Sequence, residues 1–257
     1  MAGLIAGLLL GYATHACILA RSLRPKVLFR SRDFSKRRLK YLLKRYAQFP
    51  KFSMPTGLLR SLGQNIPVFF LAYMFLPATV GSYAMAVRLM QLPIALVGES
   101  VRRTYLQKAA AFKNMGMALV PSLIKTSVML AAIGILMFAP LWAWGLELFV
   151  IVLGDQWAEA GRYVSILTPW FFSTFVQLPS SVTYIVFQRQ DQLLKIHLVS
   201  TLAIASVFAL AHRFGVSSEQ TLIALAGVGT VTNILTFGQG FRLASQHADG
   251  SGPAGGA

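Results

Sequence analysis

The chain has 257 residues, of which 55% are apolar and only 12% are charged, and its mean hydropathy is +0.59. This composition excludes a disordered chain and argues against an ordinary soluble domain. The 24 Lys and Arg residues against 8 Asp and Glu give a formal charge of +16. A chain that is both basic and apolar points to a lipid bilayer rather than to nucleic acid. Its single cysteine, Cys17, excludes a disulfide framework.

Long stretches without Asp, Glu, Lys or Arg run through the whole sequence. Because about 20 apolar residues are needed to cross a bilayer as a helix, these stretches predict seven membrane-spanning helices. We place them near residues 2–20, 56–76, 80–98, 117–142, 161–187, 193–212 and 220–241. The stretches are continuously apolar rather than alternating, so the predicted fold class is an all-α membrane helix bundle. Pro77, Ala78 and Thr79 predict the turn of a tight hairpin between the second and third spans.

The positions of the cations predict the orientation, because Lys and Arg stay on the cytoplasmic side of short loops. Twelve cations lie between residues 21 and 51, and nineteen of the 24 fall on one side. We therefore expect the N-terminus outside and the C-terminus in the cytoplasm. Aromatic and acidic residues gather around a predicted exterior loop over 143–160: Trp142, Trp144, Trp157, Trp170, Glu147, Asp155 and Glu159. The small, polar residues 243–257 are expected to form a disordered tail.

Residues 21–53 form a basic loop, within which residues 34–49 show apolar side chains at helical spacing among Lys and Arg. This pattern is typical of an amphipathic helix on an anionic membrane surface. The loop either fixes the topology and rests on lipid, or guides an anionic lipid head group; nucleic acid is the remaining and least favoured ligand.

Three cations lie within predicted spans. Arg88 is near the middle of the third span, where a central Arg costs about 2.5–3.5 kcal/mol on insertion scales. It either pairs with an acid or with carbonyls freed near Pro93, or lines a cavity for an anionic ligand. Arg60 and Lys125 lie near the cytoplasmic ends of their spans, where long cationic side chains reach the interface, and they are secondary candidates.

Several amides also lie in or near the spans: Gln64, Asn65, Gln91, Gln177 and Asn233. Each could join two helices, or together with Arg88 they could line a hydrophilic cleft. Prolines lie inside the predicted spans at positions 67, 93, 140, 169 and 179, where each can kink its helix.

The sequence shows no grouping of His, Asp and Glu at metal-ligand spacing, and no Gly-rich phosphate loop. Glu147, Asp155 and Glu159 could be suggested as a catalytic set, but a solvated loop is the simpler interpretation. We expect neither a catalytic residue, nor a metal, nor a cofactor, and we expect that the protein is not an enzyme.

Residues 45–110 contain three short motifs, and a fourth lies in the predicted exterior loop. The motifs are F-P-x-F-S-x-P (Phe49, Pro50, Phe52, Ser53, Pro55), G-x-Y-x-x-A-x-R (Gly81, Tyr83, Ala86, Arg88), L-P (Leu92, Pro93) and G-D-x-W (Gly154, Asp155, Trp157). In these motifs the chain resembles the carboxy-terminal half of Wzx-type polysaccharide flippases, within the multidrug/oligosaccharidyl-lipid/polysaccharide exporter superfamily.

The resemblance covers residues 1–242. It implies a carrier of two six-helix lobes in the bacterial inner membrane, which flips an undecaprenyl-diphosphate-linked oligosaccharide for surface polysaccharide synthesis. Residues 1–20 would then be the last helix of a first lobe, residues 21–53 the connection between lobes, and residues 54–242 the second lobe. Because such a carrier has about twice as many spans, a second polypeptide or a second copy is expected to supply the other lobe.

Physically, a carrier of this kind needs bent helices and a few buried polar groups rather than catalytic residues. The substrate-cleft candidates are Arg88, Arg60, Gln64, Asn65, Gln91 and Lys125. The alternatives are a non-catalytic membrane scaffold, another multipass exporter subunit and, less favoured, a membrane glycosyltransferase or polymerase.

Overall fold

The computed structural model describes residues 54–248, with side chains through residue 246, and five single residues before them. The chain divides into two compact units, Met1–Ala47 and Gln48–Ala257. In the first unit Gly7, Gly11, Thr14, Ile18 and Tyr41 are helical, and the Thr14 hydroxyl donates to the Gly11 carbonyl at 2.9 Å. The predicted span over 2–20 and the basic loop over 21–53 otherwise lie outside the described residues.

The described part of the second unit is helical throughout. It comprises α4 (Met54–Met74), α5 (Pro77–Pro93), the π-helix η3 (Ile94–Gly98), α6 (Glu99–Asn114), α7 (Val120–Leu153), the 3-10 helix η4 (Asp155–Trp157), α8 (Ala158–Val176), α9 (Leu178–Val186), α10 (Gln190–Phe214) and α11 (Ser218–Ala248). The expected all-α membrane helix bundle is therefore confirmed.

Four continuous helices of the described part are long and apolar enough to cross a membrane: Pro77–Asn114, Val120–Leu153, Gln190–Phe214 and Ser218–Gln246. The predicted span over 56–76 corresponds to α4, and the span over 161–187 corresponds to two helices, α8 and α9. The count of seven spans stays a prediction for two reasons. Helices α4, α8 and α9 are not among the four helices that are long and apolar enough, and most of residues 2–20 are not described.

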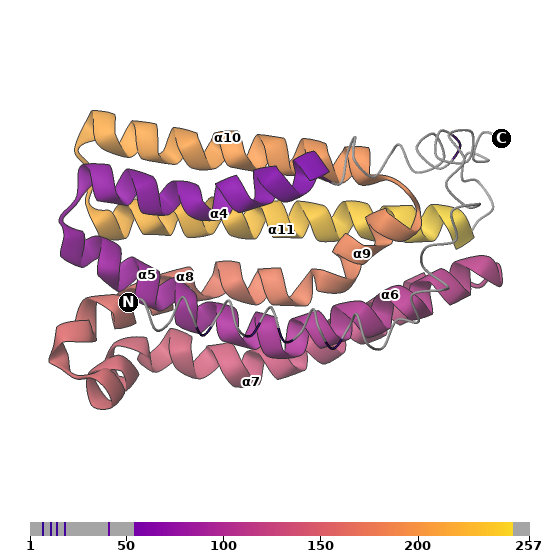
Figure 1. Cartoon of the computed structure of the whole chain (residues 1–257), viewed down its shortest axis with the longest axis horizontal. Coiled ribbons are helices and arrows are strands. Elements are labelled where there is room, and N and C mark those ends of the chain that lie inside the picture. Colours follow the sequence, from indigo (N-terminus) through magenta and orange to yellow (C-terminus); the bar gives the residue numbers. More distant parts are fainter. Residues whose placement is uncertain are drawn as a thin grey trace. The chain divides into compact units, whose positions relative to one another are not determined.

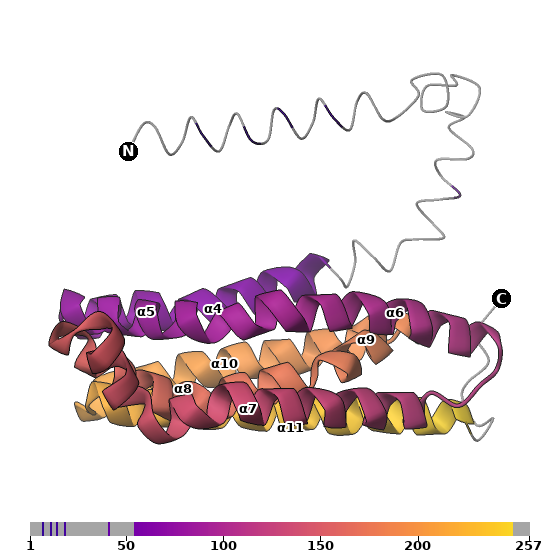
Figure 2. The ribbon, with the colours of Figure 1, turned by 90° about the horizontal axis from the view of Figure 1, so that it is seen from below.

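The helices of this unit run along one long axis (Figure 1). The layer of α4, α5 and α6 lies opposite the layer of α7 and α11, with α8, α9 and α10 between them (Figure 2). Helix α8 is central because its apolar residues recur at helical spacing, and Val164, Leu167 and Phe175 are completely buried. We call the end at the α4–α5 connection the hairpin end, and the opposite end the α6 end.

The hairpin forms as predicted, but its turn is two residues earlier. Helix α4 ends at Met74, and only Phe75 and Leu76 connect it to α5. Pro77 occupies the first turn of α5, where its missing N–H would have no helical partner and its fixed φ favours the helix. The proline therefore starts a helix instead of making the turn.

The exterior loop predicted over 143–160 is wrong, because most of it is helical. Helix α7 continues to Leu153 with one non-helical residue, Trp144 (φ −127°, ψ 28°), four residues after Pro140. The apolar residues that follow resume the helix until Gly154, whose φ of 93° ends it. The three acids of this region thus lie in α7, η4 and α8 rather than in one loop.

The disordered tail predicted from residue 243 is also wrong at its start, since α11 continues to Ala248. Leu243 and Ala244 are buried there in a cluster with residues of α6, α7, α9 and α10. The sequence pattern did not predict this end of α11, because the residues that bury it come from helices that are distant in the chain. Nothing is described beyond residue 248.

The core consists of two apolar clusters. The larger lies toward the hairpin end and includes Leu71, Tyr83, Phe138, Leu167 and Phe208. The second, which we call the α6-end cluster, gathers buried residues of five helices: Tyr105, Ala109, Leu119, Leu123, Val182, Tyr184, Phe187, Leu193, Leu243 and Ala244.

Close helix contacts and polar bonds supplement this core, as expected where lipid removes the hydrophobic drive between helices. At the crossing of α7 and α8, a Cβ on Gly161 would lie 2.6 Å from the Gly145 carbonyl oxygen. Beside it the Ser165 hydroxyl donates to the Leu141 carbonyl at 3.2 Å, next to the irregularity at Trp144. The two glycines thus bring the backbones together, and Ser165 satisfies a carbonyl at the kink.

Candidate functional site

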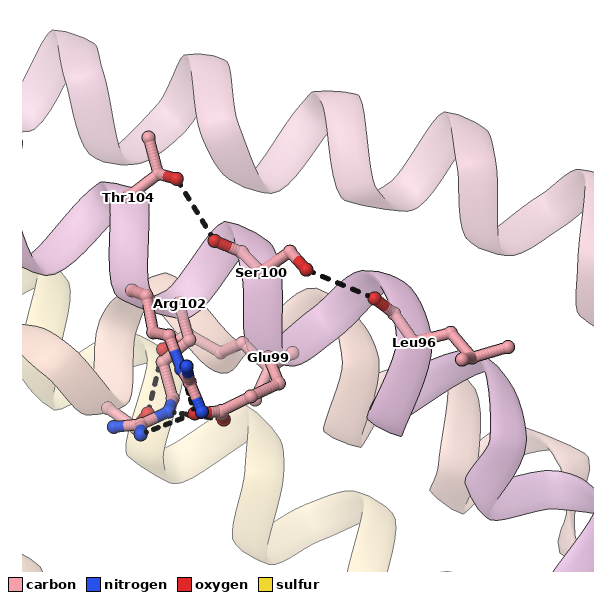
Figure 3. Close-up of polar contacts among 8 residues, drawn as sticks. Leu96, Glu99, Ser100, Arg102 and Thr104 are labelled. Carbon is pink, nitrogen blue, oxygen red and sulfur yellow. Dashed lines mark hydrogen bonds and ion pairs between the residues drawn. The ribbon is translucent and has the colours of Figure 1, made fainter. Parts of the chain in front are cut away.

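Four charged residues of α4 and α6 form a cluster toward the α6 end, which we call the Glu99 cluster: Arg60, Glu99, Arg102 and Arg103. Arg102 donates to both carboxylate oxygens of Glu99, from Nε at 2.8 Å and from Nη2 at 2.9 Å. Arg103 Nε donates to the same carboxylate at 3.0 Å. Figure 3 shows the Glu99 and Arg102 side chains beside each other on α6. One carboxylate therefore neutralises one of two adjacent guanidinium groups.

The neighbouring hydroxyls of α6 turn to its own backbone and take no part in the cluster. The Ser100 hydroxyl donates to the Leu96 carbonyl at 3.2 Å, and the Thr104 hydroxyl to the Ser100 carbonyl at 3.0 Å (Figure 3). The exposed donors at this place are consequently those of the guanidinium groups. The Arg103 side chain is 76% exposed, compared with 34% for Arg102.

Arg60 brings a third cation from α4. It interacts electrostatically with Arg102 and Glu99, and also with His197 of α10. Arg60 makes no hydrogen bond or ion pair with Glu99, but the three guanidinium groups and the one carboxylate together carry a formal net charge of +2. Because guanidinium groups match phosphate oxygens in geometry and charge, the Glu99 cluster is suited to bind a phosphate-bearing anion.

Arg88 and Gln91 lie one turn apart on α5, and both are exposed. Arg88 makes no ion pair or hydrogen bond with any residue of the described part, so neither an acid nor a carbonyl near Pro93 partners it there. Along an α-helix Arg88 lies about 16 Å before Glu99. It is thus a separate cation within the apolar part of the same long helix.

The other predicted cleft residues are also exposed. Gln64 and Asn65 lie on α4, where the Asn65 amide donates to the Ser61 carbonyl of its own helix at 2.7 Å. Lys125 lies on α7, and within residues 54–246 it forms no hydrogen bond or ion pair with the Glu99 cluster. The structure brings Arg60 to that cluster and leaves Lys125 apart from it.

Two other amides that were candidates for a hydrophilic cleft, Asn233 and Gln177, lie at contacts or breaks of the helices. Asn233 of α11 is buried, and its amide nitrogen lies within hydrogen-bonding distance of three oxygens of α8: 3.3 Å from the Trp170 carbonyl, 2.9 Å from the Ser173 hydroxyl and 2.8 Å from the Thr174 hydroxyl. It therefore joins two helices. Gln177 lies at the break between α8 and α9.

Sequence reasoning missed Glu99, Arg102 and Arg103 as site residues, and treated the two arginines only as a topology signal. The signal that identifies them is the E-x-x-R-R spacing, since residues three and four positions apart are neighbours on a helix. That signal needs the helix to continue beyond residue 98, where the predicted span ended.

The hairpin end carries a cavity of about 340 Å³, lined by Glu147, Arg162, Ser165 and Glu219 among others. Arg162 and Glu219 form an ion pair at 3.4 Å, with both side chains about half exposed. The cavity is thus lined by two carboxylates and one guanidinium group, and this excess of negative charge disfavours the binding of an anion. It differs in charge from the Glu99 cluster.

The acids once grouped as a catalytic set are not brought together. Glu147 lines the cavity, whereas Glu159 accepts hydrogen bonds from Thr79 at 3.3 Å, from Ser82 at 3.1 Å and from Tyr163. Those hydroxyls come from α5 and α8, so the Glu159 carboxylate joins two helices. Because its three donors are hydroxyl groups of these helices, the Glu159 carboxylate has a structural role.

A family model described as "Polysaccharide biosynthesis protein" matches residues 3–162. The matched region includes α4, α5, α6 and α7, and with them the Glu99 cluster and Arg88. Comparisons with curated proteins and with solved structures gave no match.

Proposed function

Because the chain belongs to this family of polysaccharide biosynthesis proteins, we propose that it acts in a transport step. It moves an undecaprenyl-diphosphate-linked oligosaccharide from the cytoplasmic to the periplasmic leaflet of the bacterial inner membrane. Its apolar helices place it in a membrane, where the lipid tail of such a substrate remains while the polar head group crosses. The protein is then a flippase, not an enzyme.

The observation that carries the proposal is the arrangement of cations on one continuous helix, Pro77–Asn114. The Glu99 cluster has excess positive charge beyond the apolar part of this helix, and Arg88 is an unpaired cation, among the described residues, within it. A diphosphate leaving water needs compensating charge at each stage, since an uncompensated charge in low dielectric is costly. The cluster receives the diphosphate and Arg88 accompanies it inward.

The α6 end is then the cytoplasmic end, in agreement with the predicted orientation of N-terminus outside and C-terminus inside. Gln91 offers a neutral hydrogen-bonding group between the two cationic positions, and Gln64 offers another on the neighbouring helix α4, which suits sugar hydroxyls. A second polypeptide or a second copy of the chain completes the cleft on the exposed face of α4 and α5. Membrane lipids surround the remaining helices.

The test uses cells whose surface polysaccharide depends on this chain, with Arg88→Ala, Arg88→Glu or Arg102→Ala in place of the natural residue. We expect about a tenfold loss of surface polysaccharide and a build-up of lipid-linked oligosaccharide in the cytoplasmic leaflet. The matched control is Arg213→Ala, an exposed arginine at the opposite end of the bundle.

Unchanged display with both Arg88→Ala and Arg88→Glu overturns the role of Arg88. Loss of display without build-up in the cytoplasmic leaflet favours the scaffold alternative over transport. Protein amount in the membrane is measured for every variant, so that a folding defect is distinguished from a transport defect.

A further inference from the structure

Two helical stretches of the bundle are irregular at one place each, and a proline lies beside each place. We call both places breaks, although the α5–α6 helix stays continuous through its π-helical segment. The α5–α6 helix contains the π-helical segment Ile94–Gly98 directly after Pro93. The α8–α9 helix breaks at Gln177, two residues before Pro179. Proline removes a backbone donor and its ring clashes with the carbonyl four residues earlier, so Pro179 is a local cause of the break at Gln177. Pro93 directly precedes the π-helical segment. π-helical segments recur at functional positions.

The two interruptions touch each other. A Cβ on Gly98, the last residue of the π-helix, would lie 2.6 Å from Leu178 Cδ1 and 3.6 Å from Phe175 Cδ2. Leu178 and Phe175 lie on either side of Gln177. The breaks therefore occur at one level of the bundle and in direct van der Waals contact, although some 80 residues of sequence separate them.

Beyond the breaks, α6 and α9 form one unit, which we call the α6–α9 pair (Figure 1). Tyr105 and Ala109 of α6 pack with Val182 and Tyr184 of α9 in the α6-end cluster. Lys113 joins the far ends of the two helices, since its ammonium donates to the Val186 carbonyl at 2.7 Å. Apolar packing and a charged hydrogen bond thus hold the pair together.

The neighbouring helices are continuous at this level. Helices α10 and α11 cross it without interruption, and the irregular residue of α7, Trp144, lies toward the hairpin end. Next to the break the pair contacts α11, where Ser180 donates to the Thr236 and Phe237 carbonyls at 3.1 and 3.2 Å and Tyr184 donates to the Thr236 carbonyl at 2.9 Å. These hydrogen bonds to adjacent carbonyls of α11 lie near the break, and the apolar contacts of the pair with α7, α10 and α11 lie in the α6-end cluster.

We propose that the α6–α9 pair bends as one unit about a hinge formed by Ile94–Gly98 and Gln177, against the continuous helices α10 and α11. Arg88 lies on one side of this hinge and the α6 residues of the Glu99 cluster, Arg102 and Arg103, lie on the other, so bending changes their separation from Arg88. The buried Gln177 Oε1 accepts no hydrogen bond from any described residue. A second position of the pair supplies that partner. The inference does not depend on the transported substrate.

The test measures distances between two spin labels in the full chain in lipid nanodiscs, with Cys17→Ser. One label pair, Lys108→Cys with Leu198→Cys, joins α6 to α10 beyond the hinge. The matched pair, Ala84→Cys with Leu210→Cys, joins α5 to α10 before it, and all four positions are exposed. We expect a broad or two-peaked distance distribution for the first pair and a single narrow one for the second.

The hinge is tested directly with Pro179→Ala, which restores a backbone donor and removes the ring clash. We expect it to narrow the distribution of the first label pair at least twofold and to leave the second unchanged. If the second pair also changes, Leu178→Ala replaces this variant. It removes the side chain between the two breaks and is expected to broaden the first distribution alone.

Equal widths for the two label pairs in the natural background, whether narrow or broad, overturn the proposal. So does an unchanged width of the first pair in a correctly packed Pro179→Ala variant, or in Leu178→Ala where that variant is used. A flippase function that fails its own test leaves these distance measurements unaffected.

Discussion

The Lys113 ammonium, near the end of α6, donates a hydrogen bond to the Val186 carbonyl at the end of α9, with 2.7 Å between Nζ and O. The last carbonyls of a helix have no partner within it, and the negative end of the helix dipole favours a cation. Lys113 also lies over the Phe187 ring, with Nζ 5.5 Å from the ring centre. One side chain thus caps a helix that is 73 residues away in sequence.

We expect Lys113→Met to lower the free energy of unfolding by about 0.5–1.5 kcal/mol, the usual net value of an intramolecular hydrogen bond. Thermal unfolding in detergent measures the effect. Lys108→Met is the matched control, because among residues 54–246 Lys108 contacts only the Phe112 ring of its own helix, 5.4 Å from the ring centre. Equal losses for the two variants would contradict the capping role of Lys113.

Gly145→Ala is expected to destabilise the protein by about 1–3 kcal/mol, the cost of overpacking a tight contact. The new Cβ would lie 2.5 Å from the Ser165 hydroxyl and 2.8 Å from the Gly161 carbonyl oxygen, and the latter belongs to the backbone of α8. The same unfolding measurement checks this value.

Gly81→Ala provides the control for this close crossing. No atom lies within 4 Å of a Cβ at Gly81 in α5, so this variant should be neutral or more stable by about 0.5–1 kcal/mol. A Gly145→Ala variant as stable as Gly81→Ala would show that α7 and α8 are not held at this distance.

We expect Asn233→Leu to cost about 0.6 kcal/mol and at most about 1.7 kcal/mol, the measured range for side-chain hydrogen bonds between membrane helices. The leucine removes the donors that connect α11 with Ser173 and Thr174 of α8. Gln239→Leu, at an exposed position of α11, changes the same helix without that loss. A larger loss for Gln239→Leu would rule out the junction.

The charge balance of the Glu99 cluster predicts opposite effects of two substitutions on anion binding. With vesicles that contain farnesyl diphosphate as the probe, Arg102→Ala should weaken binding several-fold because it removes a cation. Glu99→Gln should strengthen binding, because it removes the competing carboxylate from Arg102 and Arg103.

Arg189→Ala is the control for these binding measurements, since Arg189 lies between α9 and α10 and outside the Glu99 cluster. Weaker binding by Glu99→Gln would mean that the carboxylate positions the guanidinium groups rather than competing for them. Binding that is unchanged by both cluster substitutions would place the anion elsewhere.

The sequence alone determined the all-α membrane class and the existence of most helices. Long uncharged apolar stretches leave no other structure in lipid, where every backbone donor needs a partner within its own segment. Composition is thus sufficient to predict the fold class and most helices. The predicted span over 193–212, for example, lies within α10. The position of Arg88 within an apolar helix could also be read directly from the chain.

Only the tertiary structure decided where helices end and break. Leu243 and Ala244 lie in a helix whose end is buried in the α6-end cluster with residues of four other helices, and Gln177 divides a predicted single span where Pro179 follows. The Glu99 cluster likewise needed α6 to continue beyond the apolar stretch and α4 to bring Arg60 beside it. Such contacts join residues far apart in sequence, and local hydropathy carries no information about which distant side chains will meet.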